Sequence, residues 1–247
     1  MIDISFIVNL HAEGRICLPT LDTALTAVKY ANKHGVVSEL ILVLDNPDNG
    51  TLRLVKNLDF KCRIEITDVR DLGLARNFGV EAAGGKYIAF LDGDDLCCDD
   101  WLLKAYEEAV NHDTDCIVHP KFNLFFGRDY DQYFWVHPDC RYDGVKLSRL
   151  LVENLWTSSV FAERKIFEKI PYWRNDLKNG IGYEDWVFNI ETAVSNVRHI
   201  VAPDTIIFIR RNKTSSLLDN SNSVGVVPDI LRIFSKMNSK MNVNRII

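Results

Sequence analysis

The sequence predicts an α/β fold in which helices cover both faces of a parallel β-sheet. Through the first 100 residues, short apolar runs typical of buried strands alternate with segments whose apolar residues recur at helical spacing. Turn-forming Asp, Asn and Gly residues separate the expected elements. We expect residues 1–100 to form one half of the molecule, residues 101–220 a second, smaller region, and residues 221–247 a C-terminal tail with a helix.

The first expected unit is a strand followed by a helix. Residues 4–8 form a short apolar run that favours a buried strand. Leu21, Leu25 and Val28 then recur at helical spacing, and Gly35 follows as a residue typical of a helix end.

Three further strands and two helices are expected before residue 100. The strands are predicted by the apolar runs at residues 39–44, 62–67 and 86–91. The helices are predicted by the spacing of apolar residues at 52–58 and 75–83. Turn-rich residues 45–50 follow the first of these strands, and an Asp-Gly-Asp-Asp turn at 92–95 follows the last.

Beyond a predicted helix at residues 100–110 the pattern becomes less regular. Aromatic residues are frequent between positions 122 and 135, where we expect a region that shapes a pocket. Residues 212–223 are polar and lack periodicity, which predicts a mobile loop. Residues 230–237 regain helical spacing and predict a terminal helix packed on the body of the protein.

Composition and charge exclude several classes of protein. The chain has 247 residues, 47% of them hydrophobic, with a formal net charge of -5 and a pI of about 5.7. This composition is typical of a globular protein, and the acidic balance argues against a nucleic-acid partner. No apolar run approaches the roughly 20 residues that span a bilayer. The six cysteines show neither paired spacing nor a zinc-ligand pattern, so we expect a protein of the reducing cytoplasm.

Carboxylates follow two of the predicted strands. Ligands of open α/β sheets bind outside the carboxyl ends of the strands, so Asp45 and the turn at residues 92–95 are expected to face one crevice. Asp92 and Asp94 lie two residues apart on an extended end and would point the same way, and Gly93 between them would let phosphates approach. Hard oxygen ligands of this kind suit Mg²⁺ or Mn²⁺. By itself, such a turn is equally consistent with a structural role.

Two adjacent segments resemble the signature of family-2 glycosyltransferases. They are LARNFGV at residues 74–80 and AGGKYIAFLDGDD at residues 83–95, and the resemblance extends from residue 5 to GYEDW at residues 182–186. It implies a GT-A fold, in which a Rossmann-like nucleotide-binding sheet is fused to a smaller acceptor-binding region. Residues 1–100 would then bind the nucleotide sugar, and residues 101–220 would bind the acceptor and supply the catalytic groups.

The resemblance also implies an activity: inverting, metal-dependent transfer of a hexose from a nucleotide diphosphate to an acceptor hydroxyl in cell-surface polysaccharide synthesis. The partners would be a nucleotide-sugar donor and a saccharide or lipid-linked saccharide acceptor. The resemblance is also compatible with peripheral association of the protein with the inner face of the membrane.

The same resemblance implies roles for five donor-site residues. Asp94 of the DXD motif would bind the divalent metal, Mn²⁺ or Mg²⁺, and Asp92 would contact the ribose or the metal through a water molecule. Asp45 would accept a hydrogen bond from the base, which suits uracil and hence a UDP-sugar. His11 would lie against the base, or alternatively cap the end of its strand. Arg76 resembles the family's donor-site arginine, and the alternative is an exposed helix arginine.

Glu184 and Asp185 are the predicted catalytic pair. An inverting transfer needs a base that takes the proton of the acceptor hydroxyl. By resemblance Asp185 is that base and Glu184 supports the site. The alternative is an acidic helix N-terminus, which the helix dipole favours. Arg210 and Arg211 resemble a flexible basic segment that closes over the diphosphate, although two adjacent arginines are also ordinary surface residues.

Three other classes of protein remain to be compared. A catalytically inactive module of the same fold would bind a sugar nucleotide without turnover, and the intact acidic positions argue against it. A nucleotidyltransferase would need a glycine-rich basic loop near the first strand, which residues 9–15 lack. The same residues lack the GxGxxG pattern of an NAD-dependent dehydrogenase.

Overall fold

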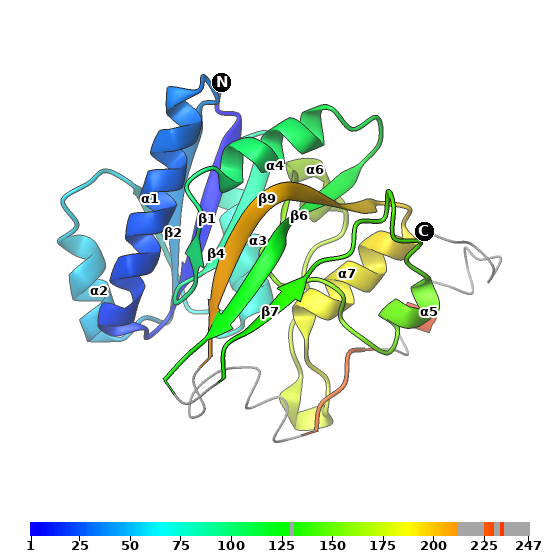
Figure 1. The fold of residues 1–247 in the computed structure, drawn as a ribbon. Helices are drawn as coiled ribbons and strands as arrows, with labels where there is room; N and C mark the ends of the chain where they lie inside the picture. The colour runs from blue at the N-terminus through cyan, green and yellow to red at the C-terminus, as the bar shows by residue number, and fades with distance from the viewer. Residues whose placement is uncertain (129–130, 212–224, 230–232, 235–247) are drawn as a thin grey trace.

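One mixed β-sheet organises the chain (Figure 1). The computed structural model describes residues 1–128, 131–211, 225–229 and 233–234, and within these residues nine strands form a single sheet. The strand order is β3-β2-β1-β4-β8-β6-β9-β5, with β7 paired to β6. The strands are β1 (Ile4–Leu10), β2 (Ser38–Asp45), β3 (Arg63–Thr67), β4 (Tyr87–Asp92), β5 (Leu96–Cys97), β6 (Cys116–Phe126), β7 (Tyr133–Val136), β8 (Phe161–Glu163) and β9 (Arg198–Arg210).

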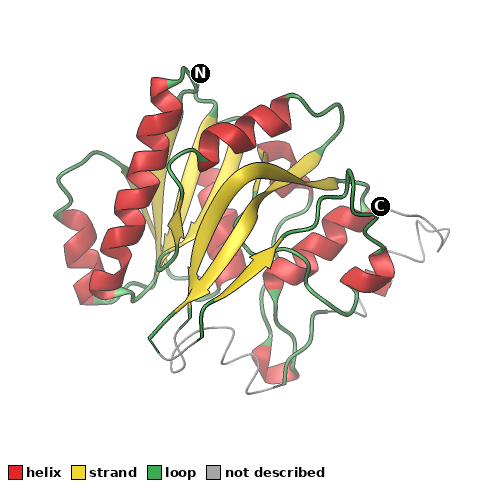
Figure 2. Cartoon of the chain, viewed as in Figure 1, coloured by secondary structure: helices red, strands yellow, loops and turns green. Residues whose placement is uncertain are grey.

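Helices lie on both faces of this sheet (Figure 2). Helices α1 and α4 cover one face, and α3, α6 and α7 cover the other. The helices are α1 (Cys17–Lys33), α2 (Asn49–Lys56), α3 (Leu72–Ala82), α4 (Trp101–Val110), α5 (Leu147–Leu150), α6 (Arg164–Lys169) and α7 (Glu184–Val194), with short 3-10 turns at Gly14–Ile16 and Leu177–Asn179. None of the helices in the described ranges is long and apolar enough to cross a membrane.

The strand directions place many loop ends at one edge. Strands β1 to β4 are mutually parallel, and β8 is antiparallel to both β4 and β6. Strand β6 therefore runs in the same direction as β4, and β9 runs parallel to β6. The carboxyl ends of β1, β2, β3, β4, β6 and β9 consequently meet at one edge, which we call the carboxyl edge.

The four strands expected before residue 100 are confirmed as β1 to β4, and the helices between them as α1 to α3. Local capping explains where two of the helices begin: Asp48 accepts a hydrogen bond from Thr51 N at the start of α2, and Asp71 accepts one from Leu74 N at the start of α3. The aromatic region that looked irregular is the hairpin of β6 and β7. The expected loop at 212–223 lies outside the described residues, as does most of the expected terminal helix.

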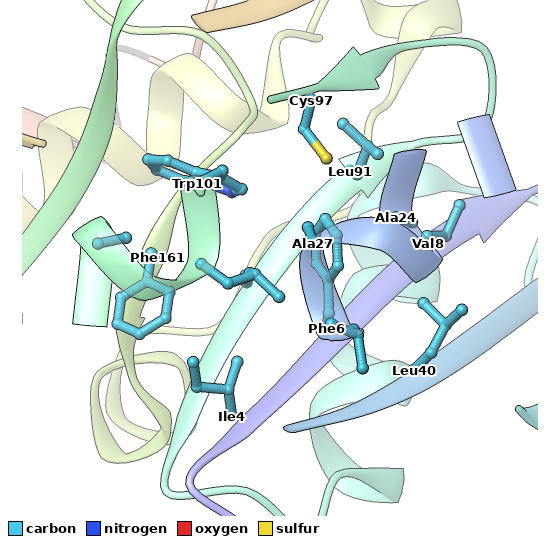
Figure 3. Packing of buried hydrophobic residues seen from close by; sticks show 14 of the residues in the cluster. Ile4, Phe6, Val8, Ala24, Ala27, Leu40, Leu91, Cys97, Trp101 and Phe161 are labelled. Atoms are coloured by element: carbon cyan, nitrogen blue, oxygen red, sulfur yellow. The ribbon is translucent and has the colours of Figure 1, made fainter. Parts of the chain in front are cut away.

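Apolar side chains fill the space between the sheet and the helices. Figure 3 shows part of the cluster beneath α1 and α4, where Phe6, Trp101 and Phe161 are almost fully buried. A second cluster beneath α3, α6 and α7 contains Phe90 and Phe188. Burial of this kind contributes about 25 cal/mol per Å² of apolar surface removed from water. The sheet is therefore a rigid support for the side chains at its carboxyl edge.

Candidate active site

The predicted residues gather at the carboxyl edge, on the face covered by α3 and α7. Asp92 ends β4 and Asp45 ends β2, while α3 supplies Arg76 and the first turn of α7 supplies Glu184 and Asp185. Strand β1 lies between β2 and β4, and its end leads to His11. The parallel sheet thus brings together residues that are far apart in the sequence.

Arg76 joins two of the carboxylates. Its Nη2 lies 2.8 Å from Asp92 Oδ1 and its Nη1 lies 2.8 Å from Glu184 Oε1. Arg76 is 0% exposed, so it is not the exposed helix arginine considered above. Burial opposes its charge, but the carboxylates of Asp92 and Glu184 outweigh burial and raise the pKa of Arg76. The side chain that resembles a donor-site arginine is therefore held inside the protein, where it ties α3 to β4 and α7.

The remaining carboxylate oxygens of this cluster also have partners. Ser158 Oγ donates to Asp92 Oδ2 at 2.8 Å, and Asn175 Nδ2 donates to Glu184 Oε2 at 3.0 Å. Asn175 also donates from its backbone to Asp71, the cap of α3. Gly73 permits this packing, because a Cβ there would lie 2.5 Å from the Trp173 carbonyl oxygen and 3.3 Å from Glu184 Cγ. Ser158 and Asn175 were not predicted from the sequence, since neither lies in a recognisable motif.

Asp94 lies among other negative charges. Burial raises its pKa to about 6, with further contributions from the charges of Asp92 and Glu13. Glu13 was not predicted; its Oε2 accepts a hydrogen bond from His11 N at 2.7 Å, and burial raises its pKa as well. Among the described residues there is no group of three or more His, Cys, Asp or Glu side chains arranged to hold a metal alone. Mg²⁺ and similar cations are often bound by one or two carboxylates together with substrate phosphates, and the repulsion around Asp94 fits that arrangement.

Gly93 also has a structural role that was not expected from the sequence. A Cβ at this position would lie 2.6 Å from the Asn9 carbonyl oxygen and 2.6 Å from Leu10 Cδ2. The absence of a side chain therefore lets the acidic turn pack against the end of β1. The glycine is required by the close approach of two loops.

Asp45 and His11 lie together at the ends of β2 and β1. Asp45 Oδ1 accepts from Arg70 N at 2.9 Å and Oδ2 from Asp71 N at 3.0 Å, so its carboxylate already holds the turn that leads into α3. Arg70 has a φ of 53° there, which explains why this turn needs support. His11 donates from Nδ1 to the Asp45 carbonyl oxygen at 2.6 Å, and its ring is exposed. The strand-end cap considered for His11 is thus present, and the ring still faces outward.

Asp185 is half-buried in the first turn of α7. Burial raises its pKa to about 7, the Glu184 charge adds to this effect, and Arg76 opposes it. Asn154 Nδ2 donates to Asp185 Oδ2 at 3.1 Å, and Asn189 Nδ2 donates to Asn154 Oδ1 at 3.0 Å. A carboxylate with a near-neutral pKa and a fixed orientation has the properties of a general base. Asn154 and Asn189 were not predicted from the sequence.

Arg210 is attached to the acidic turn. Its Nε donates to the Asp94 carbonyl oxygen at 3.0 Å, and its backbone N donates to Asp95 Oδ1 at 2.8 Å. Asp95 is buried, and burial together with the charges of Asp94 and Asp92 raises its pKa. Arg211 follows, with its guanidinium 5.6 Å from the centre of the Phe125 ring. The carboxyl end of β9 therefore borders the Asp92 to Asp95 turn.

The chain belongs to glycosyl transferase family 2, whose sequence profile matches residues 5–170. It is 25% identical over 183 residues to the glycosyltransferase GlyA of Streptococcus pneumoniae, a match that covers 70% of this chain and 25% of that protein. It is 32% identical over 109 residues to the succinoglycan biosynthesis protein ExoO of Rhizobium meliloti, which covers 43% of this chain and 30% of that protein. The matches thus span less than a third of the length of these curated relatives.

Solved structures establish the fold. Staphylococcus aureus TarS in complex with UDP-GlcNAc superposes with a TM-score of 0.69 at 15% identity, covering 98% of this chain and 68% of that chain. The mannosyltransferase PcManGT from Pyrobaculum calidifontis, in complex with GDP-Man and Mn²⁺, superposes with a TM-score of 0.61 at 17% identity, covering 86% and 58%. The fold of this chain is that of the GT-A glycosyltransferases.

Proposed function

We propose that this chain is an inverting glycosyltransferase that moves a sugar, most simply a hexose, from a UDP-linked donor to a hydroxyl of a saccharide or lipid-linked saccharide. One observation carries the proposal: the site contains both a carboxyl group with a pKa of about 7, that of Asp185, and the acidic turn of Asp92 and Asp94. Arg76 and Glu184 connect the two groups through hydrogen-bonded ion pairs. Membership of the family supports the same reaction class.

In this mechanism Asp185 accepts the proton of the acceptor hydroxyl. The acceptor oxygen forms a bond to the anomeric carbon while the bond from that carbon to the diphosphate oxygen breaks. One displacement of this kind inverts the anomeric configuration and needs one base on the side opposite the leaving group. Asn154 holds the Asp185 carboxylate in place, and Glu184 keeps Arg76 charged beside it. The protein thus orients the reacting groups and supplies the general base.

Asp94, with Asp92 beside it, would hold a divalent cation, Mn²⁺ or Mg²⁺. When bound, such a cation neutralises charge that develops on the leaving diphosphate. Support comes from the negative charges around Asp94, which a cation would offset, and from the Mn²⁺ found with the mannosyltransferase neighbour. His11 and Asp45 would border the base, with the exposed His11 ring available for stacking. We place the reaction in cell-surface polysaccharide synthesis, at the cytoplasmic side of the membrane. The similarity to ExoO, a succinoglycan biosynthesis protein, supports a role in polysaccharide synthesis.

The experiment that tests this proposal uses UDP and Mn²⁺ with Asp94→Ala. We expect calorimetry to show that Mn²⁺ strengthens UDP binding to the wild type and that this dependence is lost in the variant, because Asp94 is the carboxylate proposed on the ion. Asp99→Ala, an exposed acidic residue nearby, serves as the matched control. A variant that keeps the full Mn²⁺ dependence removes Asp94 from the metal site. Binding of UDP-sugar without hydrolysis or transfer would favour the inactive module.

A further inference from the structure

Three aromatic side chains form a row on one face of the β6–β7 hairpin. Phe125 pairs with Tyr133 across the two strands, and Asn123 pairs with Trp135. The Phe125 and Tyr133 rings stack with centroids 4.5 Å apart and an angle of 4°, and Phe125 and Trp135 lie 6.1 Å apart at 28°. We call Phe125, Tyr133 and Trp135 the aromatic row. Strand alternation sends Phe134 to the opposite face of the same strand.

The aromatic row borders the candidate active site at Asp94. Strand β6 ends at the carboxyl edge beside β9, as Figure 1 shows. The Arg211 guanidinium lies over the Phe125 ring at 5.6 Å. The preceding residue, Arg210, donates from Nε to the Asp94 carbonyl oxygen. Arg211 thus contacts the row, while Arg210, whose guanidinium lies over Phe126, contacts the acidic turn, so the end of β9 lies between the two.

A second series of contacts connects the aromatic row to Asp92. Asn123 Nδ2 donates to the Trp135 carbonyl oxygen at 3.4 Å, and Asn123 Oδ1 accepts from Thr157 Oγ1 at 3.2 Å. The next residue, Ser158, donates to Asp92 Oδ2. These contacts thus run from the aromatic row through Asn123 and Thr157 to Ser158 and Asp92.

Phe125 is buried, whereas the two β7 rings of the row are not fully covered. Cross-strand stacking of Phe125 and Tyr133 stabilises the hairpin, but Tyr133 remains 47% exposed and Trp135 is only partly covered. Large apolar rings left in solvent beside polar groups are typical of ligand-binding surfaces. A pyranose ring has an apolar face of C–H groups with hydroxyls around its rim. Such a ring matches flat aromatic side chains flanked by a polar group such as the Arg211 guanidinium.

We propose that the aromatic row is a saccharide subsite, on which a sugar unit of the acceptor stacks against Tyr133 and Trp135. This inference rests on the proposed transferase function and names its acceptor class as an oligosaccharide. Strand β8 lies between β4 and β6, and adjacent strands are about 4.8 Å apart, so the row lies roughly 10–15 Å from Asp92. That separation places the stacked sugar at least one unit away from the sugar that receives the transfer. The acceptor must therefore contain more than one sugar.

The test measures saccharide binding without a donor. The wild type, Tyr133→Ala and Trp135→Ala are applied to an array of defined hexasaccharides of glucan, chitin, galactan and mannan type, with Phe134→Ala as the control. Phe134 lies on the same strand and is 65% exposed, but faces the other way. We expect the two row variants to lose at least about tenfold in saccharide affinity while Phe134→Ala keeps it. Tyr133→Phe retains the ring and should bind like the wild type, which separates stacking from misfolding.

The outcomes distinguish this inference from the proposed function. UDP and Mn²⁺ binding is measured on the same proteins: unchanged UDP binding with lost saccharide binding supports the subsite. Failure of the wild type to bind UDP counts against the proposed function and leaves the saccharide result readable. A wild type that binds no saccharide on the array, or row variants that bind as well as Phe134→Ala, overturns the subsite. Loss of self-association by Tyr133→Ala in sedimentation, with saccharide binding intact, would assign the row to a protein interface instead.

Discussion

At the scale of single residues, Asp185 is the group on which the proposed chemistry depends. Its carboxyl is oriented by Asn154, and burial keeps its pKa near 7. A base acts on the acceptor after the donor has bound, so its role can be separated from donor binding. The structure also places Asp185 beside the ion pair of Arg76 and Glu184, in which the Glu184 charge raises the pKa of Asp185 and the Arg76 charge lowers it.

Asp185→Asn should abolish transfer and preserve donor binding, because the amide keeps the shape of the side chain and cannot take a proton. Loss of a general base typically costs about 10²- to 10⁴-fold in rate. UDP affinity, measured by calorimetry, should change by less than about tenfold. Asp99→Asn is the control. Near-normal transfer by Asp185→Asn would remove this residue from the mechanism, and lost UDP binding would place it in the donor site.

The pH dependence of transfer should report the same carboxyl. Since the pKa of Asp185 is raised to about 7, the group is protonated and inactive as a base below that pH. We expect kcat/KM to rise with pH through about 7, and below it to fall about tenfold per pH unit. A profile that stays flat between pH 5 and 8, in buffers where the protein remains folded, would contradict this assignment.

Asn154 is predicted to be a positioning residue for Asp185. A hydrogen bond to an ionised carboxylate favours the charged form, so Asn154→Leu should raise the pKa of Asp185 and move the acid limb of the rate profile to higher pH. The expected displacement is about one pH unit, from the typical strength of a charge-assisted hydrogen bond. Asn154→Ser, which can still donate, should restore part of the displacement. If Asn154→Leu lowers the rate but leaves the acid limb of the pH–rate profile at the same pH, Asn154 has a structural role alone.

At the scale of secondary-structure elements, the Arg76 cluster fixes α3 and α7 against β4. Arg76→Met leaves two carboxylates at this buried position without their cation, and removing one partner of a buried ion pair costs about 3–5 kcal/mol. We expect urea unfolding to show a loss of that order. Arg149→Met, which breaks the exposed pair between Arg149 of α5 and Glu153 beyond the end of that helix, should cost less than about 1 kcal/mol. Equal losses in the two variants would show that the Arg76 pairs are not structural.

At the scale of the whole molecule, the sheet gathers six strand ends at one edge, among them the ends of β1, β2 and β4, which lead to His11, Asp45 and Asp92. Asp45 and His11 at this edge lead us to predict a preference for uracil over guanine, which needs a wider pocket. UDP with Mn²⁺ should therefore raise Tm more than GDP at equal concentration, because a ligand bound to the folded state alone stabilises it by about 2.7 kcal/mol at 100 Kd. A larger increase in Tm with GDP than with UDP would contradict the predicted preference for uracil.

The sequence by itself determined β1 to β4, the helices between them and the acidic turn at the end of β4. These features depend on local rules, because apolar spacing and turn residues act over a few positions. It also indicated that Asp45, Asp92 and Asp94 would lie at one edge, since carboxyl ends of parallel strands coincide. The resemblance carried by the motifs supplied the remaining assignments at Arg76 and at Glu184 and Asp185.

Only the tertiary structure decided how these residues are connected. Arg76 and Glu184 are 108 positions apart, and Asp92 and Ser158 are 66 apart, so their contacts depend on the order of strands and on the packing of α7. The same packing buries Arg76 and brings Glu13 toward Asp94. The aromatic row likewise exists because β6 and β7 pair in one register and end beside β9. Contacts of this range are set by the whole sheet, and no local pattern specifies them.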